Sequence, residues 1–188
     1  DRNREFFKTI SPSMDILISS NLERLLYHIT NDATKIKSYM EKLQSTGFYQ
    51  VDEVTLKAIQ ETFSAGYLDD NATKKCIHDI YQQDNYVADT HTAVAWQVAQ
   101  DYQKSTQDKT PMVVLSTASP YKFSDSVLSA LGEDISDKDE FALLDKLSTL
   151  NKDKIPQGLA QLQSLPILHN NLCAKEDMIK AVNTFLNI

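Results

Sequence analysis

The feature that most constrains the fold is a short apolar run that stands almost alone among helical patterns. From Pro111 to Leu115 the sequence reads PMVVL, which predicts one buried β-strand. A small turn, residues 116–118, follows it, and Ser119 before Pro120 is typical of a helix start. Such a strand-to-helix junction presents hydroxyl groups at the carboxyl end of a strand, where α/β sheets bind ligands.

Most of the remaining chain predicts helices, because apolar residues recur three and four positions apart. We therefore expect a mostly α-helical chain with one short strand and few others. A single strand forms no sheet, so it either pairs with weak candidates near Ile16, Phe48 and Ile167 or has neighbours outside this chain. Aspartates that precede the helical patterns predict N-caps. The expected caps are Asp32, Asp52, Asp70, Asp89 and Asp137.

Composition limits the classes of function. The 188 residues suit about one domain, with 41% hydrophobic and 24% charged residues. A net charge of −7 argues against a nucleic-acid partner, and no apolar run is long enough for a membrane span. Two distant cysteines and the lack of a signal-like start predict a cytoplasmic protein.

Glycine is scarce. The chain has four glycines where average usage would give about 13, and no two lie close enough to form a phosphate-cradling loop. The chain also begins with aspartate rather than methionine. We therefore expect a fragment whose phosphate cradle, if it has one, lies elsewhere.

Three polar clusters could carry chemistry. The first surrounds a predicted helix start and offers hydroxyl, carboxylate, amide and guanidinium groups, which suit an anion or serve only as caps. Its candidate residues are Ser11, Ser13, Asp15, Asn21 and Arg24.

The second cluster is Asp89, Thr90, His91 and Thr92. Here Asp89 is the expected cap, and the His91 ring either relays or orients a proton or is simply packed. The third cluster runs from Ser116 to Phe123 and is either a ligand site or a helix cap alone.

A metal site is not expected. Cys76 and His78 have a ligand-like spacing but lack two further ligands.

The three clusters together resemble one family. SPSMDI followed by SSNLER, then DTHTAV, then STASPYKF resemble, in this order, the motifs of threonine synthase. Bacterial-type members typically read SPSMDI and SNxER, then DPHTA, then TAxPxKF. This chain departs from that pattern at Thr90, which replaces the usual proline.

The resemblance implies the carboxyl-terminal portion of a pyridoxal-phosphate (PLP) enzyme of fold type II, an α/β fold. The implied lyase converts O-phospho-L-homoserine and water to L-threonine and phosphate. The family's Schiff-base lysine and phosphate loop precede the SPSMD motif, so no catalytic lysine is expected here, and the isolated chain should be inactive.

The resemblance also implies roles for residues. Thr117, with Ser116 as second choice, would face the cofactor's pyridine nitrogen, where a neutral hydroxyl tunes the ring's electronics. The substrate's phosphate would be met by Ser11, Ser13, Asn21 and Arg24, which Asp15 would orient. Lys122 is a further possibility for the phosphate, and Asp89 and His91 would shape the pocket wall.

The implied organisation places the motifs in residues 1–31 and 86–131, a helical insertion in 32–85 and carboxyl-terminal helices in 132–188. Apolar surface left by a missing half predicts self-association. The alternative is a standalone helical interaction module derived from the enzyme scaffold.

Overall fold

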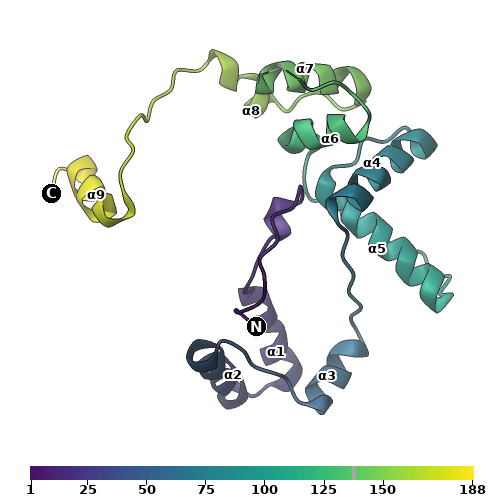
Figure 1. The fold of residues 1–188 in the computed structure, drawn as a ribbon, viewed down its shortest axis with the longest axis vertical. Helices are drawn as coiled ribbons and strands as arrows, with labels where there is room; N and C mark the ends of the chain where they lie inside the picture. The colour runs from purple at the N-terminus through teal and green to yellow at the C-terminus, as the bar shows by residue number, and fades with distance from the viewer. Residues whose placement is uncertain (137–138) are drawn as a thin grey trace. The chain divides into compact units, whose positions relative to one another are not determined.

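The computed structural model describes residues 1–136 and 139–188, and its regular structure is helical (Figure 1). The chain divides into two compact units, Asp1–Lys154 and Ile155–Ile188. The α-helices of the first unit are α1 (Ser20–Thr30), α2 (Ala33–Thr46), α3 (Glu53–Gln60), α4 (Asp70–Asp84), α5 (Thr90–Thr106), α6 (Ser124–Ala130) and α7 (Glu140–Leu150). Among its described residues, the first unit also has the 3-10 turns η1 (Pro12–Met14) and η2 (Pro120–Phe123).

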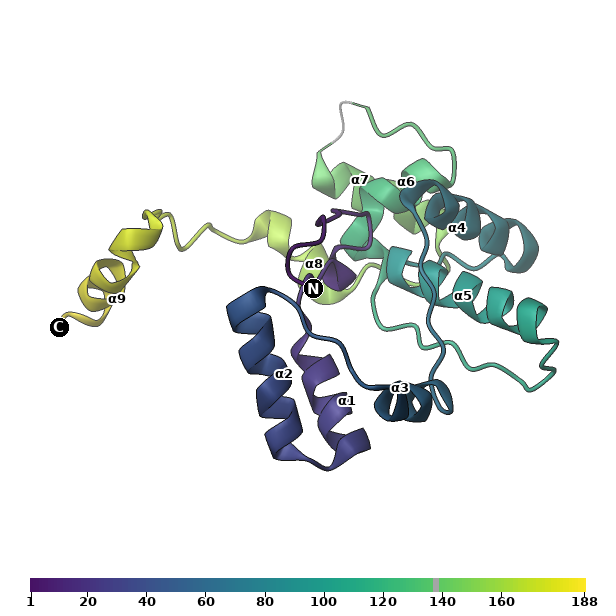
Figure 2. The ribbon, with the colours of Figure 1, turned by 60° about the horizontal axis from the view of Figure 1, so that its bottom comes forward.

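Helices α1, α2 and α3 share one apolar core. Helix α1 packs against both α2 and α3, and α1 and α2 lie side by side in Figures 1 and 2. Leu26, Ile36 and Tyr39 are buried at the centre of this core. Helix α2 ends where Gly47 adopts a left-handed conformation with φ of 85°, which glycine reaches without steric cost.

Helices α4 to α7 form the second packed group of the first unit. Helix α4 contacts α5 and α6, and α6 contacts α7. In α4, α6 and α7 apolar positions are buried at helical spacing, as the sequence predicts, whereas in α5 the expected inner stripe is wrong: Ala93 is buried and Ala95 is exposed. The buried side chains are Cys76, Ile77, Ile80, Ala93, Val127, Leu128, Ala130, Leu143, Leu144 and Leu147.

The expected aspartate caps are confirmed at most positions that the structure describes. Asp32, Asp52 and Asp89 each accept a hydrogen bond from a backbone N–H of the helix that follows. At α4 the predicted cap is wrong by one residue, because Asp69 caps the helix. Asp70 instead accepts from the backbone N–H of Ile10, 3.0 Å away.

An ion pair also joins the first turn of α2 to the start of α3. The Lys35 ammonium group forms an ion pair with Asp52 and donates a hydrogen bond to the Thr55 hydroxyl at 3.1 Å. This pairing holds the pKa of Asp52 far below its usual range, chiefly through the hydrogen bond from Lys35. The predicted Asp137 cap lies outside the described residues, and the described helix begins at Glu140 with Asp139 as its cap.

The predicted strand is not formed. Residues 111–115 carry no strand pairing, and no strand is found in the part of the chain that the structure describes. The weak candidates near Ile16, Phe48 and Ile167 are not strands either. A strand needs a hydrogen-bonded neighbour, and none of the described segments supplies one. The side chains of Met112, Val113 and Leu115 are consequently exposed, Val113 to 86%, whereas Val114 is half-buried.

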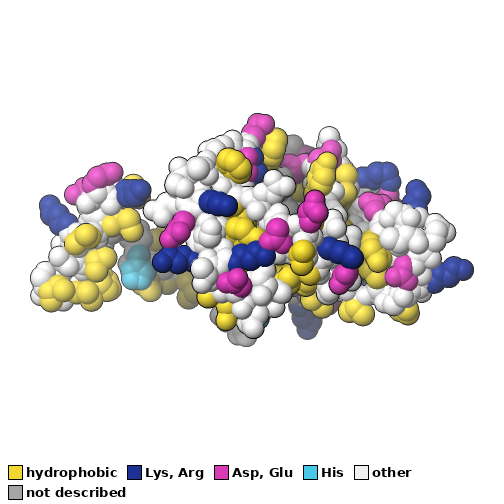
Figure 3. Space-filling model, turned by 90° about the horizontal axis from the view of Figure 1, so that it is seen from below, with side chains coloured by type: hydrophobic (Ala, Val, Ile, Leu, Met, Phe, Trp, Pro, Cys, Tyr) yellow, Lys and Arg dark blue, Asp and Glu magenta, His cyan; other side chains and the backbone are white. Residues whose placement is uncertain are grey.

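The second unit consists of short helical elements joined by irregular chain. Its elements are α8 (Gln157–Ala160), η3 (Leu162–Ser164), η4 (Lys175–Asp177) and α9 (Met178–Leu186). Helix α9 carries an apolar stripe whose members, including Phe185, are exposed. Figure 3 shows apolar side chains at the surface among charged ones. Within the described residues, we find no helix that is both long and apolar enough to cross a membrane.

Candidate functional site

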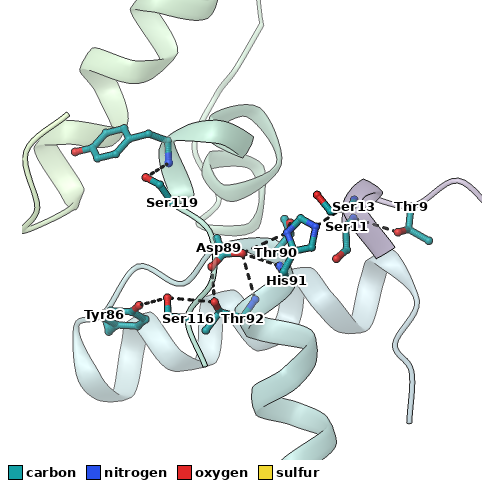
Figure 4. Close-up of polar contacts among 11 residues, drawn as sticks. Thr9, Ser11, Ser13, Tyr86, Asp89, Thr90, His91, Thr92, Ser116 and Ser119 are labelled. Carbon is teal, nitrogen blue, oxygen red and sulfur yellow. Dashed lines mark hydrogen bonds and ion pairs between the residues drawn. The ribbon is translucent and has the colours of Figure 1, made fainter. Parts of the chain in front are cut away.

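The carboxylate of Asp89 lies at the centre of the site, at the start of α5 (Figure 4). One oxygen, Oδ1, accepts from the backbone N–H groups of His91 at 2.9 Å and Thr92 at 3.2 Å. The other oxygen, Oδ2, accepts a short hydrogen bond from the Thr92 hydroxyl. Asp89 is 1% exposed, so these donors replace water as partners of the carboxylate.

His91 joins the start of α5 to the first motif. Its Nε2 accepts a hydrogen bond from the backbone N–H of Ser13, 3.2 Å away. Its Nδ1 lies 3.3 Å from the Thr90 hydroxyl and 3.4 Å from Asp89 Oδ1. Because Nε2 accepts a hydrogen bond and oxygen atoms lie around Nδ1, the single proton of the neutral ring is assigned to Nδ1.

The His91 ring also contacts the third motif. Its centroid lies 4.9 Å from that of Phe123 in η2, with the two planes tilted by 49°. A single imidazole therefore contacts residues from the first and third motifs and is held by the second.

The loop that carries Ser11 and Ser13 is held by Asp15. The Asp15 carboxylate accepts from the Thr9 backbone N–H at 2.7 Å and from the Thr9 hydroxyl at 2.8 Å. The Thr9 hydroxyl accepts in turn from the Ser11 backbone N–H at 3.1 Å. Asp15 thus orients the loop.

Ser11 carries an unsatisfied polar atom. Its side chain is 6% exposed, yet its hydroxyl has no hydrogen-bond partner among the described residues. Leaving a buried hydroxyl unpaired costs about 1–3 kcal/mol. A hydroxyl in this state fits a ligand oxygen, and the exposed Ser13 lies two residues away on the same loop.

Hydroxyl groups connect the third motif to α5. Ser116 Oγ lies 3.3 Å from Thr92 Oγ1 and 3.1 Å from the Tyr86 hydroxyl. Thr117 is exposed beside this chain of hydroxyls. The three hydroxyl-bearing residues also border a cavity of about 290 Å³. The cavity is lined by Ile80, Asp84, Tyr86, Thr92, Trp96, Val114 and Ser116.

The turn after Ser116 folds as its sequence predicts. Ser119 precedes Pro120 and accepts a hydrogen bond from the Tyr121 backbone N–H at 3.4 Å. Tyr121 is buried, and its hydroxyl donates to the Asp153 carbonyl at 2.6 Å. Burial raises the pKa of Tyr121 above its ordinary value.

Three predicted site residues lie apart from this hydrogen-bonded cluster. Asn21 and Arg24 are exposed in the first turns of α1, where the Arg24 guanidinium donates to the Asn21 side chain. Lys122 is exposed in η2. The structure therefore brings together Ser11, Ser13, Asp89, His91 and Ser116.

Sequence reasoning placed Thr92 in the second cluster without a role, and it missed Tyr86. In the structure the Thr92 hydroxyl donates to the carboxylate of Asp89, three residues earlier. Tyr86 precedes the motif and gives no local signal, because its contact with Ser116 spans 30 residues.

The cluster is rich in hydroxyls and backbone donors and offers no grouping of metal ligands. The residues that the structure describes contain no set of three or more His, Cys, Asp or Glu side chains arranged to hold a metal ion. Groups that accept hydrogen bonds, such as phosphate oxygens or a heterocyclic nitrogen, match its donors.

Residues 92–182 match the family model of the threonine synthase carboxyl-terminal region. Human threonine synthase-like 1 is 36% identical over 175 residues, which cover 91% of this chain and 21% of the human protein. Threonine synthase from Saccharomyces cerevisiae is 31% identical over 184 residues, covering 88% of this chain and 33% of the yeast protein.

Solved structures agree with the sequence comparisons. A PLP-bound threonine synthase from Brucella melitensis superposes with a TM-score of 0.73 at 32% identity, over 97% of this chain and 34% of that one. Yeast threonine synthase gives a TM-score of 0.72 at 29% identity, over 88% of this chain and 33% of that one. The chain thus spans between a fifth and about a third of the length of these relatives. By its motifs, sequence and fold, it belongs to the threonine synthase family, in the carboxyl-terminal portion.

Proposed function

We propose that this chain is the carboxyl-terminal part of the catalytic region of a threonine synthase, which converts O-phospho-L-homoserine and water to L-threonine and phosphate. The observation that carries the proposal is the contact between Ser13 and His91. It joins two motifs that lie 78 residues apart in sequence. The motif-bearing residues 1–31 and 86–131 would then supply one wall of the active site, with 32–85 as a helical insertion and 132–188 as the carboxyl-terminal helices.

PLP fits the third motif. The cofactor, when bound, withdraws electrons from the substrate's carbon atoms, and an un-ionised hydroxyl facing its pyridine nitrogen favours elimination and replacement over transamination. Ser116 and Thr117 present hydroxyls at this place in the motif, with Thr117 exposed. In this proposal they hold the nitrogen side of the ring, while the Schiff-base lysine and the phosphate-binding loop lie outside these 188 residues.

The first motif fits the substrate's phosphate. The unpaired Ser11 hydroxyl and the exposed Ser13 hydroxyl are neutral donors on one loop. Arg24, supported by Asn21, adds positive charge at the start of α1, whose free backbone N–H groups favour an anion. Lys122 is a second cation, in the last turn of η2. These residues would bind and orient the phosphate.

His91 would hold the loop that carries Ser11 and Ser13 in place against the start of α5. Its Nε2 fixes the backbone at Ser13, and Asp89 and Thr90 fix the ring. In this proposal the imidazole shapes the pocket and moves no proton, because Nε2 already holds the Ser13 N–H.

The test uses the gene product that contains these 188 residues, supplied with PLP and O-phospho-L-homoserine. We expect release of equal amounts of phosphate and L-threonine. Ser11→Ala should raise the KM for the substrate about tenfold, since one hydrogen bond to a charged group is lost. Ser38→Ala, on the exposed side of α2, is the control and should leave the KM unchanged.

A gene product that neither binds PLP nor releases phosphate would refute the proposal and would suit the helical interaction module instead. The isolated chain should be inactive. When PLP is added, it should develop no absorbance band at about 410 nm, the usual region of the lysine-bound cofactor. Such a band would contradict the placement of the lysine outside this chain.

A further inference from the structure

The loop of residues 9–15, which we call the first-motif loop, is held in shape from within. The Asp15 carboxylate accepts from the Thr9 backbone N–H, and the Thr9 hydroxyl accepts from the backbone N–H of Ser11. The Asp15 N–H donates back to the Pro12 carbonyl at 3.1 Å. Because these bonds lie within the loop, they fix its shape but do not fix its position relative to the helices.

Two further hydrogen bonds join the backbone of the first-motif loop to other elements of the described chain. The Ser13 N–H donates to His91 Nε2 at the start of α5, 3.2 Å away (Figure 4). The Ile10 N–H donates to Asp70 Oδ1 at the start of α4, 3.0 Å away. The two contacts span 78 and 60 residues of sequence. They therefore determine where the loop lies.

The two contacts lie on either side of Ser11. Ile10 directly precedes Ser11, and Ser13 follows it two residues later. Ser11 is 6% exposed, and its hydroxyl has no hydrogen-bond partner among the described residues. A group that binds a ligand must be held within about 0.5 Å of its productive place. The bond between Ile10 and Asp70 is therefore well placed to set the position of the Ser11 hydroxyl.

Asp70 makes this contact while its neighbour caps the helix. The Asp69 side chain accepts from the Ala72 backbone N–H at 2.7 Å and is the N-cap of α4. Asp70, the first residue of α4, is half-buried, and its carboxylate is a stronger acceptor for an N–H than a neutral group would be. Helix α7 begins with the same pair of acidic residues, because the exposed Glu140 directly follows the Asp139 cap.

We propose that Asp70 is a positioning residue for the binding of the substrate's phosphate. By accepting from the Ile10 N–H, it holds the first-motif loop against α4 and keeps the Ser11 hydroxyl in place for a phosphate oxygen. The part of this statement that concerns the phosphate rests on the proposed function, whereas the anchoring of the loop concerns this chain only. Asp70 itself does not touch the substrate and acts through Ser11.

The first experiment measures amide hydrogen exchange in the gene product that contains these residues, labelled with ¹⁵N-isoleucine. Asp70→Ala should speed exchange of the Ile10 amide at least about tenfold, because the acceptor is lost. Asp70→Asn keeps an oxygen that accepts, so exchange should stay within about threefold of wild type. The amide of Ile77, which is buried in α4, should change less than about twofold in both variants.

Two results of this experiment would overturn the anchoring role. One is exchange of the Ile10 amide at the same rate in wild type and Asp70→Ala. The other is an equal increase at Ile10 and Ile77, which would show that Asp70 only stabilises α4.

The second experiment measures the KM of the same gene product, supplied with PLP, for O-phospho-L-homoserine. Asp70→Ala should raise the KM about fivefold, the value of one hydrogen bond, and change kcat less than about twofold. In the Ser11→Ala background the same substitution should raise the KM less than about twofold, because Asp70 acts through Ser11. Asp70→Asn should restore the KM to within about twofold of wild type. Glu140→Ala is the matched control in α7 and should leave the KM unchanged.

The outcomes separate the two proposals. A KM that rises by the same factor with and without the Ser11 hydroxyl overturns the action of Asp70 through Ser11. A KM that falls in both Asp70→Ala and Asp70→Asn would show that the carboxylate repels the phosphate, and it overturns the positioning role. No phosphate release by the wild type refutes the proposed function and the phosphate part of this proposal together, and exchange of the Ile10 amide still decides whether Asp70 anchors the loop.

Discussion

Replacing Asp89 by alanine should destabilise the first unit far more than the loss of an ordinary helix cap. Asp89→Ala removes the acceptor for the backbone N–H groups of His91 and Thr92 at the start of α5. It also removes the acceptor for the Thr92 hydroxyl, which is buried with the rest of the Thr92 side chain. Two kinds of interaction are therefore lost at one site.

The magnitude follows from these contacts. Loss of a capping side chain costs about 0.5–2 kcal/mol, and a buried hydroxyl left without its charged partner costs about 1–3 kcal/mol. We expect Asp89→Ala to reduce the free energy of unfolding by about 3 kcal/mol. Asp89→Asn keeps the cap and should cost less than about 1.5 kcal/mol.

Asp139→Ala is the matched control. Asp139 caps α7 through one bond, from the Ala142 backbone N–H at 2.8 Å, and is exposed, so its loss should cost about 1 kcal/mol. The assay is urea unfolding followed by the fluorescence of Trp96, the chain's single tryptophan, which lies in α5 and reports on the first unit. Equal costs for Asp89→Ala and Asp139→Ala would refute the reasoning.

Three further predictions concern the backbone, the thiols and the response to acid. Gly47→Ala should destabilise the chain by about 1–2 kcal/mol in urea unfolding, because the residue is left-handed and its added Cβ would meet the amino-terminal segment, whereas Gly158→Ala has open space and should cost nothing measurable. A thiol reagent should modify the exposed Cys173 within minutes and Cys76 only upon unfolding, since burial raises the pKa of Cys76 to about 11; equal rates would contradict this. Because its lysine partner lowers the pKa of Asp52 in the folded chain, wild type should be more stable than Asp52→Asn above about pH 4 and lose that advantage as the pH falls further; a difference that grows in acid would show the opposite sign.

Helix starts could be predicted from the sequence because a cap is a local contact. An aspartate that accepts a hydrogen bond from a backbone N–H a few residues later needs no distant partner. The predicted caps are confirmed for Asp32, Asp52 and Asp89. At α4 two adjacent aspartates make the same local signal, and the structure uses Asp69 as the cap. The strand at 111–115 failed because strand formation depends on a neighbouring strand, which residue type alone does not reveal.

In the candidate site, too, local features could be predicted from the sequence and long-range contacts could not. The roles of Ser11, Ser13 and His91 were suggested by motifs, and the structure adds that they lie in one cluster, through a contact between residues 78 positions apart. Residue patterns alone could not give that contact, which is why the family resemblance was needed. The contacts of Ser116 with Tyr86 and Thr92 emerge only from the three-dimensional arrangement.

The central claim is that one histidine holds the three motifs together in a single site. Long-range ¹H–¹⁵N NMR correlation of the His91 ring tests it most directly, because the arrangement requires a proton on Nδ1 and a bare Nε2 that accepts from Ser13. We predict the Nδ1–H tautomer, with a nuclear Overhauser effect between the imidazole ring protons and the Ser13 amide proton. A proton on Nε2 with no Overhauser effect to Ser13 would show that the first motif is not held against α5.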